Sequence, residues 1–142
     1  MMDWIAGLSM RDYVDRHFGV RRGEEKLMNK LSAAIARAAA QAGDARVVLG
    51  IRATVPNLSI HFGDGLPRLF IERAARHLER LLARTHVTLT LRIEALREQE
   101  LPTLEQLLDR LRRYGDRVSI VVDRELRKKL SIDSSVFHLV LE

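Results

Sequence analysis

The sequence contains no cysteine, and this absence removes disulfide bonds, thiol nucleophiles and thiolate-bound metals from the possible chemistry. Aromatic residues make up only 5% of the chain, so few rings are present to stack on unpaired nucleic-acid bases. No apolar run approaches the roughly 20 residues that a transmembrane helix needs. A chain of this kind is typical of a reducing compartment, and we expect a cytoplasmic protein.

Sequence signatures of catalysis and of metal binding are also missing. The five histidines show neither the H-x-H nor the H-E-x-x-H spacing of metal sites. The sequence also shows no arrangement of serine, histidine and an acid that indicates a catalytic nucleophile. We therefore predict no bound metal and no cofactor. The sequence does not decide whether the chain is an enzyme, but it favours a role without catalysis.

The residues that are present can build a globular core. Of the 142 residues, 46% are hydrophobic and 30% are charged, which suits one folded domain and argues against disorder. We expect that domain to span residues 23–142. We expect residues 1–22 to form an N-terminal segment, rich in apolar and aromatic side chains, that includes one short helix.

One stretch, residues 87–122, predicts the centre of the fold. Residues 87–94 alternate apolar and polar side chains, as in a strand with one buried face, and residues 118–122 form a second, β-branched strand. A helix between them is indicated by four leucines at three- and four-residue steps: Leu104, Leu107, Leu108 and Leu111. A strand, a helix and a strand in this order predict a βαβ unit with two parallel strands.

Similar patterns predict the other elements, in the order α-α-β-β-α-β-α-β-(α)-β. Pro56 and Asn57 indicate the turn of a β-hairpin. Residues 136–141 are apolar on both faces, apart from His138, and predict an interior or well-covered strand. The predicted fold class is α/β (mixed α+β), a single layered domain with a mixed sheet of about five strands.

The positive charge is concentrated in one part of the chain. Residues 110–129 hold eight lysines and arginines and three acidic residues, an excess equal to the net charge of +5. Such a segment attracts polyanions, but with only Tyr114 inside it the reading of bases is poorly supported. One hypothesis is a nucleic-acid-binding accessory protein that uses this basic patch, namely Arg110, Arg112, Arg113, Arg127, Lys128 and Lys129.

A glycine-containing turn suggests another hypothesis. Gly63, Asp64 and Gly65 lie between a strand and a helix, where free amides and the helix dipole favour a phosphate. The dinucleotide fingerprint needs a third glycine, and the phosphate loop needs a Gly-Lys-Ser or Gly-Lys-Thr ending; neither is present. A phosphate-ligand-binding domain is therefore the weakest alternative.

A three-residue similarity to a known family involves Asp133, Ser134 and Ser135. They resemble the D-S-S-G motif of the anti-anti-sigma (STAS) domains, which also have an α/β architecture. Where that family has glycine and then a helix, this chain has Val136 and a strand. No site is assigned from this similarity.

The N-terminal segment carries three of the seven aromatic residues. It either folds back on the core or contacts a partner, and the residues that we predict for a contact are Trp4, Leu8, Tyr13 and Phe18. The favoured function is a small non-catalytic interaction or regulatory domain that binds a protein partner or self-associates. We expect a homodimer, formed through this segment or through an edge of the sheet.

Overall fold

The computed structural model describes residues 22–43, 45–130, 132 and 134–142. Its helices are α2 (Arg22–Ala42), α3 (Arg68–Arg84), α4 (Leu101–Leu111) and α5 (Arg124–Lys129), with the 3₁₀ turns η1 (Glu98–Glu100) and η2 (Arg112–Arg117) on either side of α4. Its strands are β1 (Ala45–Arg52), β2 (Val55–Phe62), β3 (Thr88–Ile93), β4 (Val118–Val122) and β5 (His138–Leu141). The element order predicted from the long helix onward is confirmed. The short helix predicted before it lies outside the described residues.

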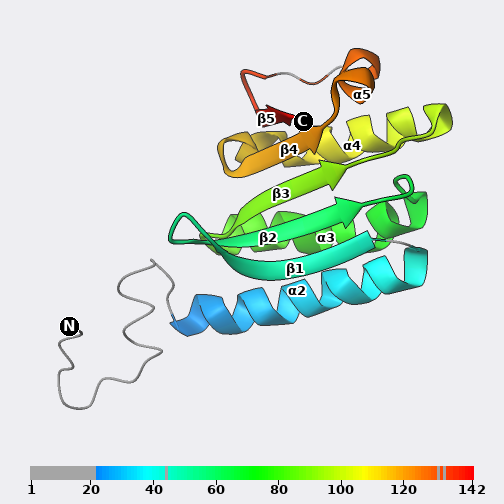
Figure 1. The fold of residues 1–142 in the computed structure, drawn as a ribbon. Helices are drawn as coiled ribbons and strands as arrows, with labels where there is room; N and C mark the ends of the chain where they lie inside the picture. Colours follow the sequence, from blue (N-terminus) through cyan, green and yellow to red (C-terminus); the bar gives the residue numbers. More distant parts are fainter. Residues whose placement is uncertain (1–21, 44, 131, 133) are drawn as a thin grey trace, which may run out of the picture.

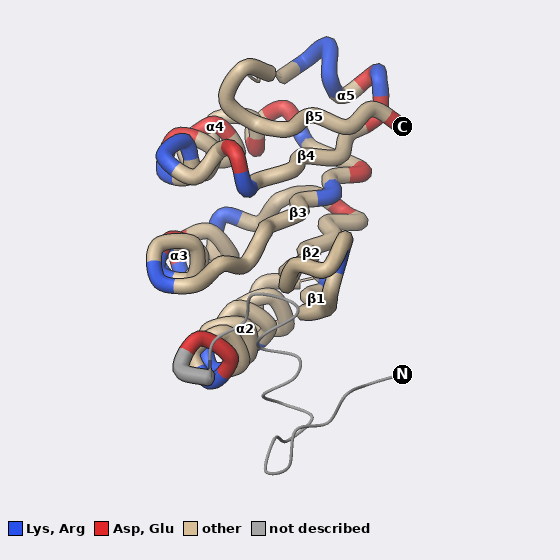
Figure 2. The backbone as a smooth tube through the Cα atoms, turned by 90° about the vertical axis from the view of Figure 1, so that its left-hand side faces the viewer, with Lys and Arg blue, Asp and Glu red and all other residues tan. Residues whose placement is uncertain are grey.

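The strands form one mixed sheet in the order β1-β2-β3-β4-β5 (Figure 1). β1 runs antiparallel to β2, and the other three pairs of neighbours are parallel. The predicted α/β class and the parallel βαβ unit around α4 are therefore confirmed. Figure 2 shows α2, α3 and α4 together on one side of the sheet. The described part of the chain places no long helix on the opposite side, which we call the open face.

The core fills the space between the sheet and these three helices. Alternate residues of the inner strands are fully or almost fully buried: Leu58, Ile60 and Phe62 in β2, Leu89, Leu91 and Ile93 in β3, and Val118, Ile120 and Val122 in β4. The rings of Phe62 and Phe70 meet edge to face with their centroids 5.2 Å apart. This alternation is the period-two pattern that residues 87–94 show in the sequence.

The turn of the β1–β2 hairpin lies at Ala53 and Thr54, and its predicted position at Pro56 and Asn57 is wrong. The φ angles of Ala53 and Thr54 are 52° and 65°, the left-handed conformation that a two-residue type I′ turn needs at both positions. Pro56 lies inside β2, where it is tolerated because pairing with β3 begins only at Asn57. Neither glycine nor asparagine marks the true turn, so the sequence carries no signal for it.

β5 is an outer strand of the sheet, and the prediction of an interior strand is wrong. Its ladder with β4 covers only four residues, and Leu141 is 50% exposed. Phe137, which comes directly before β5, is buried in the core. The apolar run is therefore shared between a turn that enters the core and a short edge strand, and this explains why both of its faces are apolar.

Candidate interaction surfaces

The four residues predicted to contact a partner, Trp4, Leu8, Tyr13 and Phe18, lie outside the described residues. Their contacts, and a homodimer formed through them, stay predictions. The domain boundary expected between residues 1–22 and 23–142 lies at the start of the described residues and is likewise untested. The surfaces that can be analysed belong to α2 and to the elements that follow it.

The basic residues of segment 110–129 fall into two groups. α4 and η2 end where β4 begins, whereas α5 follows the last residue of β4, so the groups lie at opposite ends of this strand (Figure 1). A five-residue strand is about 16 Å long, which separates the two groups by more than a Debye length at physiological salt. The predicted basic patch is therefore not one continuous surface.

Several of these basic residues bind acceptors within the chain. Arg110 contacts the Glu79 carboxylate through two hydrogen bonds, Nε to Oε1 at 3.1 Å and Nη2 to Oε2 at 2.7 Å. Arg127 donates to two backbone carbonyl oxygens just after α5, at 2.9 and 3.3 Å. Lys128 Nζ lies 3.3 Å from Oε1 of Glu125. The two carboxylates offset the charges of Arg110 and Lys128, and the carbonyl oxygens occupy donors of Arg127 without changing its charge.

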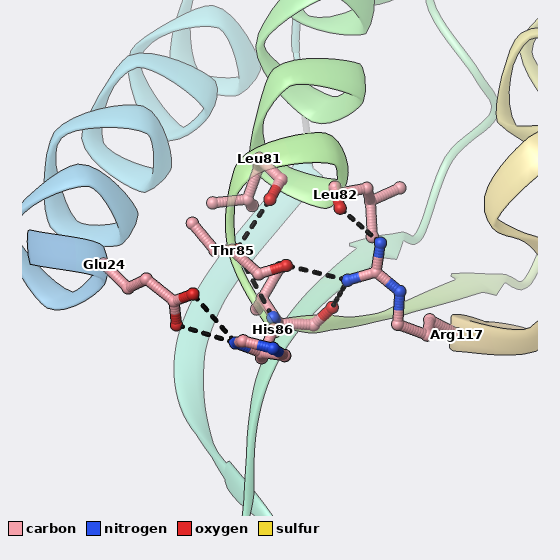
Figure 3. Close-up of polar contacts among 7 residues, drawn as sticks. Glu24, Leu81, Leu82, Thr85, His86 and Arg117 are labelled. Carbon is pink, nitrogen blue, oxygen red and sulfur yellow. Dashed lines mark hydrogen bonds and ion pairs between the residues drawn. The ribbon is translucent and has the colours of Figure 1, made fainter. Parts of the chain in front are cut away.

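Arg117 belongs to the same segment, but its side chain contacts the backbone of the chain itself. Its guanidinium donates to three backbone carbonyl oxygens at the end of α3 and the start of β3, those of Leu82, Thr85 (2.8 Å) and Val87 (3.3 Å) (Figure 3). The last carbonyls of a helix have no partner within it, and a cation is favourable at that end. The predicted nucleic-acid binding is untested, and the placement of these residues adds no support to it.

The amide of Leu66, directly after the turn formed by Gly63, Asp64 and Gly65, is occupied by a carboxylate of the chain itself. Glu100 accepts hydrogen bonds from the backbone N–H groups of Leu66 (3.1 Å) and Arg97 (2.9 Å). Gly65 has a φ of +93°, and a Cβ at this residue would lie 2.8 Å from Glu100 Oε1. A phosphate would have to displace Glu100 from the position where the sequence suggested a phosphate site.

Around Asn57, the open face of the sheet carries polar side chains that hydrogen-bond to one another. Asn57 is only 6% exposed; its Nδ2 donates to Oγ1 of Thr88 (2.9 Å) and of Thr90 (3.1 Å), and its Oδ1 accepts from Ser59 (2.9 Å). Arg52 Nη1 reaches Thr90 Oγ1 at 3.4 Å. The strand positions of this face carry no Phe, Tyr or Trp; the rings present are those of His61 and His138.

β1 is the other outer strand, and it differs from β5. It is eight residues long, and within the described residues its hydrogen-bonded neighbour is β2 alone. Val48 and Ile51 are 61% and 57% exposed, the two largest exposures among the large hydrophobic side chains of the described residues. β1 contains neither lysine nor proline, and its charged side chains, Arg46 and Arg52, lie near its two ends. The sequence predicted contact through a sheet edge, and β1 is the edge best suited to it.

The hairpin turn determines which backbone groups of β1 are unpaired. In a two-residue turn the flanking residues, here Arg52 and Val55, exchange both of their hydrogen bonds. Alternate residues of β1 therefore bond to β2, and the others direct their N–H and C=O groups away from the sheet. These others form what we call the outer edge of β1: Ala45, Val47, Leu49 and Ile51.

α2 lies beside the outer edge of β1. Both views show it next to β1, at the end of the helix layer (Figures 1 and 2). It extends sideways beyond β1, on the side away from β2. Gln41 accepts a hydrogen bond from Arg73 of α3, so this flank of α2 faces α3. The opposite flank carries mostly small residues at three- and four-residue steps, which we call the α2 flank: Asn29, Ala33, Ala36 and Ala40. A strand added to β1 would have this flank next to its helix-facing side chains.

Within the described ranges, no three His, Asp or Glu side chains are grouped so that they could hold a metal ion. None of the helices described here is long and apolar enough to span a membrane. No family model matches the chain, and comparisons with curated proteins and with solved structures give no match either. Because no match indicates a functional site, the candidate interaction site is chosen from geometry alone. It is the outer edge of β1, with the α2 flank beside it.

Proposed function

We propose that the chain is a non-catalytic interaction domain that binds an extended segment of a partner protein along the outer edge of β1. The observation that carries this proposal is an eight-residue outer strand with exposed apolar side chains and with neither lysine nor proline. An added strand would pair the backbone groups of this edge, and backbone pairing is the main source of affinity in this mode of recognition. Val48 and Ile51 would lose exposed apolar surface in the same step.

A second copy of the chain fits this edge less well than an extended segment. If two β1 strands paired about a twofold axis, the axis would lie about 2.4 Å beyond each strand, half the usual spacing of strands. α2 also reaches past β1, so its two copies would meet near the axis, whereas packed helices need about 8–10 Å between their axes. An extended segment brings no second helix to this place.

The test removes one outward amide and leaves the ladder with β2 intact. Ile51→Pro deletes an N–H group that faces away from β2, a position where an edge strand tolerates proline. Ile51→Ala is the matched control, because it shortens the same side chain but keeps the amide. Peptides selected from a random display library against the full chain are then titrated against the parent and both variants by fluorescence anisotropy.

We expect the selected peptides to bind Ile51→Pro roughly tenfold more weakly than Ile51→Ala, as for the loss of one backbone hydrogen bond. Circular dichroism of both variants checks that the fold is kept. Equal affinity for the two folded variants would contradict the proposal, and so would a library that yields no binder.

A further inference from the structure

The side chains of β1 on the open face form a row with a charge at each end. Arg46, Val48, Gly50 and Arg52 follow one another at two-residue steps, and all four residues are exposed. The two arginines lie six residues apart, about 20 Å along the strand. Between them stand one aliphatic side chain and one glycine.

We infer that the segment bound at β1 is acidic, with two carboxylates six residues apart that lie opposite Arg46 and Arg52. This inference rests on the proposed function, because it assumes that an added strand pairs with β1. Side chains of paired strands stand opposite each other with a two-residue period, so an acid opposite Arg46 places the residue six positions away opposite Arg52. The spacing is the same for a parallel and for an antiparallel segment. A guanidinium binds a carboxylate through two parallel hydrogen bonds, which favours Asp or Glu at both positions.

Gly50 favours a large side chain on the segment between the two acids. A Cβ at Gly50 would have no atom within 4 Å, so the backbone of β1 is uncovered there. An aromatic ring on the neighbouring strand covers such a glycine well. Val48, two residues away on the same face, favours an aliphatic partner. The expected segment therefore alternates acid, aliphatic, aromatic and acid on its open-face side.

Arg52 can turn to a carboxylate without leaving a buried group unpaired. Its contact with Thr90 is long, 3.4 Å between Nη1 and Oγ1, and a hydrogen bond of this length is weak. Thr90 Oγ1 also accepts from Asn57 at 3.1 Å, so it keeps a partner when Arg52 moves. A bidentate contact with a carboxylate, in which both partners are charged, is stronger than the single long bond that is given up.

The test uses a labelled peptide with the core Glu-Thr-Val-Thr-Tyr-Thr-Glu, the reversed core, and versions with both Glu residues changed to Gln or to Lys. Each is titrated by fluorescence anisotropy against the parent chain and the double variant Arg46→Glu/Arg52→Glu. The matched control is Arg113→Glu/Arg124→Glu, which makes the same change of net charge at two other exposed arginines.

We expect the Glu peptide in one of the two directions to bind the parent chain roughly tenfold more tightly than the Gln peptide. We expect Arg46→Glu/Arg52→Glu to prefer the Lys peptide, and Arg113→Glu/Arg124→Glu to keep the preference for Glu. Equal binding of the Glu and Gln peptides overturns the acidic segment but leaves strand addition at β1 intact. A reversed preference in the control variant also overturns it, because the attraction would then follow net charge alone. If no peptide binds, the inference fails, and the library selection described above decides whether the proposed function fails with it.

Discussion

Replacing Arg117 by alanine tests whether one member of the basic segment stabilises the fold. The substitution removes the donors to three backbone carbonyl oxygens. Leu82 lies in α3, Thr85 directly follows α3, and Val87 directly precedes β3. It also removes the contact of the guanidinium with Tyr114, whose ring centroid lies 5.7 Å from the guanidinium carbon. The end of α3 and the start of β4 would lose their direct polar connection.

The expected loss of stability follows from the number of these contacts and from the exposure of Arg117. A hydrogen bond from a charged group contributes about 1.5–3 kcal/mol, and a cation–π contact at an accessible site contributes about 0.5–1 kcal/mol. Arg117 is only half-buried, so water replaces part of what is lost. We therefore expect the free energy of unfolding to fall by about 3 kcal/mol, which lowers the melting temperature by about 10 °C in a chain of this length. Arg117→Lys should fall between the parent and Arg117→Ala, because an ammonium cannot reproduce the planar fork.

Urea unfolding followed by circular dichroism measures this difference. Arg113→Ala is the matched control: it removes an exposed arginine of the same segment and should change the stability by less than about 0.5 kcal/mol. If Arg117→Ala lost no more stability than Arg113→Ala, the three backbone contacts would contribute nothing and the reasoning would be refuted.

Two further substitutions test the polar contacts on the open face and at the glycine turn. Asn57→Ala removes the amide donor to the hydroxyl oxygens of Thr88 and Thr90, and Thr90 keeps only the long contact from Arg52. Urea unfolding should show a loss of about 2 kcal/mol, and a loss below about 0.5 kcal/mol would contradict the described network. Glu100→Ala frees the amide of Leu66, so sulfate should raise the melting temperature of this variant more than that of the parent, compared with chloride at equal ionic strength. An equal response of the two proteins to sulfate would show that Glu100 does not occupy an anion site.

The sequence allowed the central elements to be predicted because their signals are local. The alternation in β3 and the leucine spacing in α4 depend only on neighbours within a few residues. The hairpin turn was misplaced because Ala53 and Thr54 adopt left-handed angles without the usual residues, while Pro56 gives a strong but misleading signal two residues later. Here the pairing of β1 with β2 outweighs the local preference of two residues.

The candidate site was less predictable because it depends on contacts between distant residues. Glu100 accepts a hydrogen bond from the amide of Leu66, 34 positions earlier in the sequence, and no local sequence pattern indicates such a contact. Arg110 and Lys128 look like neighbours in a basic run, but β4 lies between them. The order of the strands decides which two of them become edges, and this order is not encoded in any single segment.

The unequal lengths of the two outer strands limit how copies of this chain can assemble with each other. Head-to-tail growth of a continuous sheet would join β5 of one chain to β1 of the next. β5 has four residues, so such a joint would pair at most four of the eight positions of β1. A short strand at one end is one of the ways in which sheet proteins avoid edge-to-edge aggregation. If strand addition at β1 holds as proposed, the expected stoichiometry is one segment to one chain, and the short β5 disfavours growth into fibres.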